Sequence, residues 1–181
     1  MNNDLKKVNR LKQTINKNTQ ISVYQFEERV IEIKRVSKVT KGGLRLSFTA
    51  TFIVGNKKGT IGLGIGKASE IPDAIRKAKK NGIKNLISIP ITKSLSIPHD
   101  ILGNYGACSV LMKPAIEGSG VIAGGAVRII LEILGVQNII AKQLGSNNLL
   151  NNARATLNAL TNLMTNIDVA KKRNIKLEDT F

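Results

Sequence analysis

The chain has 181 residues, enough for one domain or two small ones, and 42% of them are hydrophobic, which argues against a disordered chain. Its 28 Lys and Arg against 12 Asp and Glu give a formal net charge of +16, which opposes compaction and favours a polyanionic partner over a merely soluble surface. No apolar run reaches the roughly eighteen residues of a membrane span, and the single cysteine, Cys108, excludes an internal disulfide.

Positive charge is concentrated in the first half of the chain. Residues 1–90 hold 19 Lys and Arg against 6 Asp and Glu, a net +13, whereas residues 91–181 hold 9 against 6, a net +3. The first half is therefore the predicted binder of a polyanion. The initial residues lack an apolar signal core and the Ser and Arg richness of a transit peptide, so we expect the protein to act in the compartment where it is made.

Residues 1–25 form a basic, Asn- and Lys-rich extension, which fits either a weak amphipathic helix or an unstructured arm. From Phe26 the pattern changes to an alternation of apolar and polar residues, which predicts strands. "RVIEIKRVSKVT" is a first strand, "GG" a turn, "LRLSFTATFIV" a second strand, "GNKKG" a hairpin loop and "TIGLGIG" a third strand. The apolar residues of the second strand, from Leu44 to Phe52, are expected to share one face.

A helix follows, with Ser69 as its expected N-cap and Pro72 in its first turn, so residues 26–90 predict a basic β-β-β-α domain. Residues 91–167 restart the pattern. "SLSIP" and "ACSVLMKPA" predict strands around a loop, "GSGVIAGGAVRIILEILG" a glycine-rich turn and a helix ended by Gly135, "VQNIIAKQLG" a strand, and "NNLLNNARATLNALTNLM" a long helix. Residues 168–181 form a charged tail that we expect to be frayed. The predicted core residues of the first of these helices are Val127, Ile130, Leu131 and Leu134. In the long helix, Ala153, Leu157, Leu160 and Met164 are expected to share one face.

Three glycine patterns resemble nucleotide-binding motifs, and two of them fail. A Walker loop requires a glycine where Ile61 stands and Ser or Thr where Ala68 stands, and "GLGIGK" lacks the third glycine of a dinucleotide loop. "GSGVIA" satisfies G-x-G-x-x-A before a helix. However, no carboxylate lies between Glu132 and Asp168, where the ribose-binding acid is expected. The bare N–H groups of that helix N-terminus still suit a phosphate.

Catalytic and metal-binding residues are too few for an enzyme. The chain has one histidine and one cysteine, and Glu117 stands where a nucleophile elbow needs its first glycine. His99 beside Asp100 fits a loop, and a conventional zinc site would need carboxylates for most of its ligands. We therefore predict no enzymatic activity, no metal and no cofactor.

Phosphate binding by the basic β-β-β-α domain is the remaining interpretation. Lys and Arg neutralise phosphates, and glycine-rich turns let the backbone approach them closely. Aromatic residues are only 3% of the chain, which disfavours stacking of single-stranded bases and favours structured RNA. Two alternatives stay open: a nucleotide- or RNA-acting enzyme, and a DNA-binding architectural protein, for which only the N-terminal extension could reach a minor groove.

Four long motifs resemble the family of bacterial-type small-subunit ribosomal protein five. Between Arg29 and Leu163 they occur in this order: "RVSKVTKGG" with "FTA" behind it, "VGNKKGTIGLGIGKASEIPDAIRKA", "KPAIEGSGVIAGGAVRIILEILGV" and "NIIAKQLGSNNLLNNARATLNAL". The resemblance implies an α+β fold with a double-stranded-RNA-binding-like domain over residues 26–90 and a βαβα-type domain over residues 91–167. The first of these agrees with the order read from the residue pattern.

The resemblance also implies a function. It implies a structural constituent of the small ribosomal subunit that binds small-subunit rRNA near the mRNA entry path, neighbours ribosomal proteins four and eight, and supports assembly and decoding accuracy. The loop matching Lys38, Lys41, Gly42 and Gly43 is implied to lie against rRNA and to bear on spectinomycin sensitivity. "LGSNNLLNNARAT" resembles plastid members, so we expect a plastid ribosome or otherwise the bacterial cytoplasm, and no membrane partner.

The sequence departs from the family at three positions. Leu44 stands where a basic residue commonly follows the paired glycines, and Arg45 comes next, so the charge has either moved to the other sheet face or the loop has adjusted. Ser109 replaces a usual basic residue, which puts in doubt the contact with protein four at that point. Leu149 replaces a usual proline.

The expected RNA-binding residues are Arg35, Lys38, Lys41, Gly42, Gly43, Arg45, Lys57, Lys58, Lys67, Arg76, Lys77 and Lys80. A second set is expected to contact rRNA or a neighbouring protein: Gly118, Gly120, Gly124, Gly125 and Arg128. Gly62, Gly64 and Gly66 have two interpretations of equal weight, because a strand glycine marks either close approach of a ligand or tight packing within the sheet.

Overall fold

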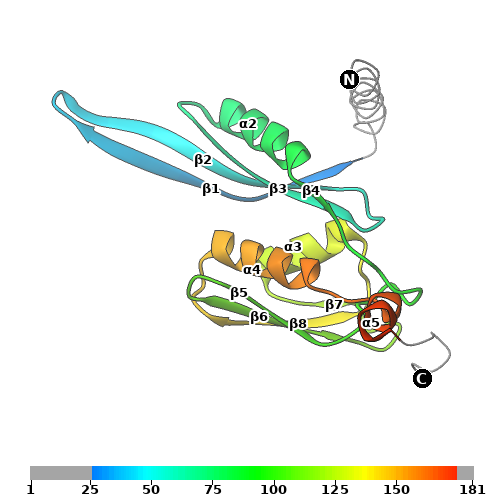
Figure 1. Ribbon diagram of the computed structural model, residues 1–181. Coiled ribbons are helices and arrows are strands. Elements are labelled where there is room, and N and C mark those ends of the chain that lie inside the picture. The colour runs from blue at the N-terminus through cyan, green and yellow to red at the C-terminus, as the bar shows by residue number, and fades with distance from the viewer. Residues whose placement is uncertain (1–25, 175–181) are drawn as a thin grey trace, which may run out of the picture.

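Four strands and one helix form the first unit of the protein. In the computed structural model, which describes residues 26–174, the strands are β1 (Glu27–Thr40), β2 (Gly43–Gly55), β3 (Thr60–Ala68) and β4 (Leu86–Ser88). They form an antiparallel sheet in chain order, with a register shift in β1 between Val30 and Glu32. Helix α2 (Ile71–Lys84) connects β3 to β4 and lies along one face of the sheet (Figure 1).

Close packing of α2 on β3 explains three glycines. A Cβ added to Gly64 would collide with the carbonyl oxygen of Ala78, and one on Gly66 with that of Ala74. Gly62 faces the backbone of α2 in the same way. The helix therefore rests directly on the strand backbone, which favours the packing interpretation of these glycines.

The second unit is a four-stranded sheet with helices on one face. Its strands are β5 (Ile101–Tyr105), β6 (Cys108–Pro114), β7 (Val121–Ile122) and β8 (Ile139–Gly145), in the order β5-β6-β8-β7. Only β7 runs parallel to its neighbour β8, and α3 (Gly125–Leu134) makes the crossover between them. Helix α4 (Leu149–Thr161) packs beside α3, and α5 (Asn166–Arg173) follows it.

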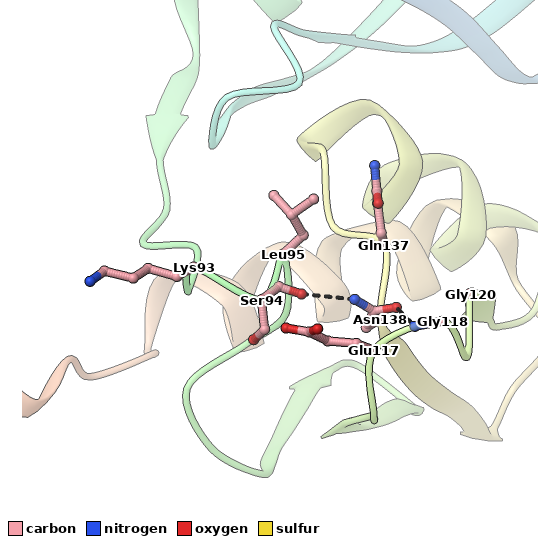
Figure 2. A pocket seen from close by; sticks show the side chains of 8 residues that line it. All are labelled: Lys93, Ser94, Leu95, Glu117, Gly118, Gly120, Gln137 and Asn138. Atoms are coloured by element: carbon pink, nitrogen blue, oxygen red, sulfur yellow. Dashed lines mark hydrogen bonds between the residues drawn. The ribbon is translucent and has the colours of Figure 1, made fainter.

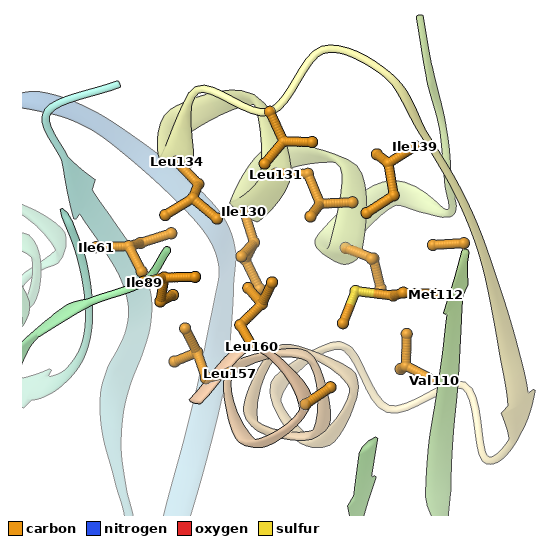
Figure 3. Close-up of a cluster of buried hydrophobic side chains, with 14 of the residues drawn as sticks. Ile61, Ile89, Val110, Met112, Ile130, Leu131, Leu134, Ile139, Leu157 and Leu160 are labelled. Carbon is orange, nitrogen blue, oxygen red and sulfur yellow. The ribbon is translucent and has the colours of Figure 1, made fainter. Parts of the chain in front are cut away.

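Helix α3 is apolar on nearly all sides because it is buried between the two units. Figure 1 shows α3 and α4 between the first sheet and the second. Ile61 and Ile89 of the first unit join Ile130, Leu134 and Leu160 of the second in one hydrophobic cluster (Figure 3). Full burial of side chains of this size contributes about 1.5–3 kcal/mol each. One core therefore stabilises both units.

Most predicted elements are confirmed by the structure. The β-β-β-α order of the first unit and both long helices of the second are present. Gly135 ends α3 with a φ of 99°, in the left-handed region that favours glycine. Cys108 is buried, as are all the predicted core residues of α3. Ala153, Leu157 and Leu160 of α4 are buried, but the prediction that Met164 shares their helix face is wrong, because Met164 lies beyond the end of the helix and is exposed.

Three local predictions are wrong. "SLSIP" forms turns instead of a strand, because Ser96 is buried and donates its hydroxyl to the carbonyl oxygen of Asn138 at 2.5 Å. The strand begins later, at Ile101, within the predicted loop. Helix α2 has Glu70 at its N-cap, not Ser69, and Glu70 makes no side-chain capping bond.

The predicted fraying of the tail is wrong as far as Arg173. Helix α5 begins with a capping box, in which Thr165 Oγ1 accepts from the N–H of Asp168 at 3.3 Å and the Asp168 carboxylate accepts from the N–H of Thr165 at 3.1 Å. Thr165 Oγ1 also donates to the Asp168 carboxylate at 2.6 Å, and this bond, followed by that from the N–H of Thr165, holds the pKa of Asp168 below its usual range. The N-terminal extension, for which a helix or an unstructured arm was predicted, lies outside the described residues.

Candidate nucleic-acid interface

A long two-stranded hairpin leaves the first sheet. Strand β3 pairs with β2 only as far as Phe48, whereas β1 and β2 pair on to Thr40 and Gly43. The distal half of the hairpin therefore has no third strand and runs past the end of α2 (Figure 1). Both of its faces are open to a partner.

One face of this hairpin is basic. Lys38 pairs with Arg45 across the strands, and Thr49 pairs with Lys34 on one side and Lys67 on the other. Directly opposed residues project from the same face of a sheet, so the four cations share it. We call Lys34, Lys38, Arg45 and Lys67 the basic face. Within residues 26–174, only Lys34 among them pairs with a carboxylate, that of Glu32 at 3.1 Å.

The opposite face of the hairpin is apolar and exposed. Val39 pairs with Leu44, and Leu46 follows on the same face of β2. Their exposed fractions are 78% for Val39, 66% for Leu44 and 49% for Leu46. We call these three residues the apolar face. Arg45 thus lies on the face opposite Leu44 and joins Lys38.

The tip of the hairpin exposes its backbone. Thr40 Oγ1 donates to the carbonyl oxygen of Gly43 at 3.0 Å, and Gly43 has a φ of 125°, which favours glycine. A Cβ on Gly42 would meet nothing within 4 Å. Lys41 is exposed beside these glycines. Backbone N–H groups and one ammonium are therefore accessible together at the tip.

The other predicted cations are not part of this surface. Lys57 and Lys58 lie in the β2–β3 loop, where the N–H of Lys57 donates to the carbonyl oxygen of Ile133 at 3.0 Å and its ammonium pairs with Glu27. On α2, Arg76 pairs with Asp73 at 3.5 Å, while Lys77 and Lys80 are exposed. These side chains form separate basic areas on the same unit.

The glycine-rich loop before α3 is held by a buried asparagine. Asn138 donates from Nδ2 to the carbonyl oxygen of Ser94 at 2.8 Å and accepts at Oδ1 from the N–H of Gly118 at 3.0 Å (Figure 2). Gly118 and Gly120 line a cleft with Lys93 and Glu117. Strand β7 separates them from the helix, so they do not form its N-terminus, which begins at Gly124 and Gly125.

Arg128 belongs to an ion cluster that joins the two units. Its Nε donates to Glu132 Oε1 at 2.8 Å, and Arg29 Nη1 of β1 donates to Glu132 Oε2 at 2.9 Å. The bond from Arg128, with its charge and that of Arg29, holds the pKa of the Glu132 carboxyl below its usual range. Glu132 therefore links α3 to Arg29 of β1, and Arg128 holds that carboxylate from within α3, a role that the sequence did not indicate.

Sequence reasoning missed Lys34 and the exposure of the apolar face. Strict alternation from Lys38 back to Lys34 could have placed Lys34 on the basic face. The exposure of Leu44 and Leu46 depends on where α2 ends relative to the hairpin. The residue pattern of the hairpin itself does not indicate that position. Across the described residues, no cluster of His, Cys, Asp and Glu could hold a metal ion, and no helix is long and apolar enough to span a membrane.

Comparisons with known proteins agree on one family. A family model described as "Ribosomal protein S5, N-terminal domain" matches residues 26–90, and "Ribosomal protein S5, C-terminal domain" matches residues 103–173. "Small ribosomal subunit protein uS5c" of Trieres chinensis is 58% identical over 97% of this chain and 95% of the relative. The protein of that name in Phaeodactylum tricornutum is 59% identical over 97% and 99%. "Small ribosomal subunit protein uS5" of Nostoc punctiforme is 56% identical over 86% and 89%.

The chain belongs to the ribosomal protein S5 family, as a structural protein of the small ribosomal subunit and not an enzyme.

Proposed function

We propose that this protein binds small-subunit rRNA through the basic face and the tip of the β1–β2 hairpin. The observation that carries the proposal is the gathering of Lys38, Arg45 and Lys67 on one face without carboxylate partners among residues 26–174. The sequence itself has no Asp or Glu between Glu32 and Glu70. Phosphates of RNA supply the missing negative charge, and the accessible glycine backbone at the tip lets them approach closely.

A charge-reversal experiment tests this interface. We expect the K38E/R45E variant to bind a small-subunit rRNA fragment at least tenfold more weakly than the unmodified protein, because two phosphate contacts become repulsive. The matched control is K142E/K171E, which reverses the same number of positive charges in the second unit and so changes the net charge equally. If both variants bound rRNA equally weakly, the loss of affinity would be due to net charge alone, which would contradict the proposal.

The DNA-binding alternative predicts a different preference. An architectural DNA-binding protein would bind duplex DNA and rRNA equally at matched salt, since it would read only the phosphate chain. A protein that recognises the A-form shape and the 2′-hydroxyls of folded RNA prefers the rRNA fragment, and this preference persists as salt is raised. Competition between duplex DNA and the rRNA fragment for the protein, at 50 and 200 mM salt, distinguishes the DNA-binding hypothesis from the RNA-binding one.

The finer assignments rest on the family. We propose that the bound protein lies near the mRNA entry path, neighbours ribosomal proteins four and eight, and supports assembly and decoding accuracy. Gly118, Gly120, Gly124, Gly125 and Arg128 are proposed to contact rRNA or one of these proteins. The outer face of the second sheet is a candidate for a protein contact, because Leu102, Ile122 and Ile140 are exposed there. Ser109 lies on the same face, paired with Leu144.

The proposed location is the small subunit of a plastid ribosome, or otherwise of a bacterial one. It is supported by the uS5c relatives of Trieres chinensis, Phaeodactylum tricornutum and Thalassiosira pseudonana, which match 96% or 97% of this chain, whereas the uS5c of Porphyra purpurea and the uS5 of Nostoc punctiforme each match 86%. Sedimentation of cell extracts tests it. We expect the protein in the small-subunit fraction after a high-salt wash, and a free protein would contradict the proposal.

A further inference from the structure

The two faces of the β1–β2 hairpin differ in chemistry, and only the basic face is explained by phosphate binding. Val39, Leu44 and Leu46 belong to neither hydrophobic cluster of the described residues. The apolar cluster under α2 ends at Phe48, one residue pair short of Leu46 along the face. The apolar face therefore continues the side of the sheet that α2 covers, but lies beyond the end of that helix and outside the folded core. A contiguous exposed apolar patch on a small, highly charged protein is typical of an interaction site.

Charge decides what kind of partner can cover this face. Arg35 lies on the same face, opposite Phe48, and Lys41 is at the tip. Lys38 and Arg45 are on the other side of the same two strands. A partner that covers the apolar face must therefore also neutralise cations at its edges. RNA does both, because its wide, shallow minor groove presents sugars and base edges between two rows of phosphates.

We propose that the hairpin is held by structured RNA on both sides, and that Val39, Leu44 and Leu46 pack against ribose and base edges while the cations bind the flanking phosphates. This inference rests on the proposed function and assigns a second, non-ionic contact to the same hairpin. Phosphate contacts release counterions, so their contribution to affinity falls as salt rises. Apolar packing releases none, so its contribution changes little between 50 and 200 mM salt.

The slope of affinity against salt separates the two contacts. We expect V39A/L44A to bind a small-subunit rRNA fragment about tenfold more weakly than the unmodified protein at both 50 and 200 mM salt, with an unchanged slope of log K against log salt. K38A is expected to reduce the magnitude of that slope by about 1. Leu44→Met keeps the apolar volume and is expected to bind like the unmodified protein. Ile167→Ala, which truncates an exposed apolar residue of the second unit, is the matched control and is expected to have no effect.

Each other outcome overturns the inference in a distinct way. Unchanged affinity of V39A/L44A, or a loss accompanied by a changed slope, would mean that the apolar face makes no non-ionic RNA contact. Normal rRNA affinity with failed incorporation into small subunits would assign the face to a protein neighbour. If the unmodified protein itself did not bind rRNA, the proposed function would fail, which is a separate result. The substituted side chains are exposed, so thermal unfolding of the variants is expected to match that of the unmodified protein.

Discussion

Single glycine positions in this protein have opposite roles. Gly64 lies within β3, where the sequence left two interpretations open, and Gly42 lies in the turn between β1 and β2. Gly64 is covered by α2, whereas Gly42 has open space where a side chain would be. The first glycine is required by packing, and the second leaves the backbone accessible.

We expect Gly64→Ala to destabilise the fold by about 1–3 kcal/mol, because its Cβ would collide with the carbonyl oxygen of Ala78 and push α2 off the sheet. Gly42→Ala is the control and is expected to change the free energy of unfolding by less than about 0.5 kcal/mol. Urea unfolding followed by circular dichroism measures both. Equal stability of the two variants would contradict the packing role of Gly64.

At the scale of elements, the helices and strands that depend on local residue pattern were predicted from the sequence. Alternation placed β1, β2 and β3, helical spacing placed α2, α3 and α4, and Gly135 marked the end of α3. "SLSIP" was mispredicted because tertiary bonds from Ser96 and Asn138 override its strand propensity. Alternation alone could place Lys34 and Lys38 on one face of β1, whereas Arg45 and Lys67 join them through the pairing register of β2 with β1 and β3. The apolar face could not be predicted, because it depends on the length of α2 relative to the hairpin.

Contact between β1 and α3 depends on pH through Glu132. Its pKa is lower in the folded protein, so the folded state binds fewer protons than the unfolded state as pH falls. The stabilisation is complete above the ordinary glutamate pKa of about 4.3 and is lost as pH falls below it towards the folded pKa. Glu132 is partly exposed, at 30% of its side chain, so solvent screening limits the effect to about 1 kcal/mol.

The measurement is the urea midpoint at pH 6 and at pH 3.5 for the unmodified protein and Glu132→Gln. The variant is expected to be less stable at pH 6 and to lose less stability on acidification, since it has no carboxyl to protonate. Arg76, whose pair with Asp73 lies on the surface of α2, provides the control variant Arg76→Gln, which should leave the pH dependence almost unchanged. An identical pH dependence in Glu132→Gln would contradict the role of this carboxylate.

At the scale of the whole molecule, the two units share one core, although the family is matched by two separate models. An apolar helix such as α3 indicates burial, but its sequence does not specify which elements cover it. In the structure, Ile53 and Ile61 of the first sheet pack into the same cluster as Val110 and Met112 of the second. The hairpin and the outer face of the second sheet are therefore carried by units that share a single hydrophobic cluster.

Coupling through α3 gives the last prediction. Leu134 is fully buried in the shared cluster, and its truncation to Ala is expected to cost about 2–5 kcal/mol. Because the cluster belongs to both units, amide hydrogen exchange is expected to accelerate by the same free energy in β3 and in β6, which lie in different sheets. Leu102→Ala, on the exposed outer face, is the control and is expected to leave both strands protected. Faster exchange in β6 with β3 unchanged would mean that the units unfold independently, in which case the hairpin could bind RNA without the second unit in place.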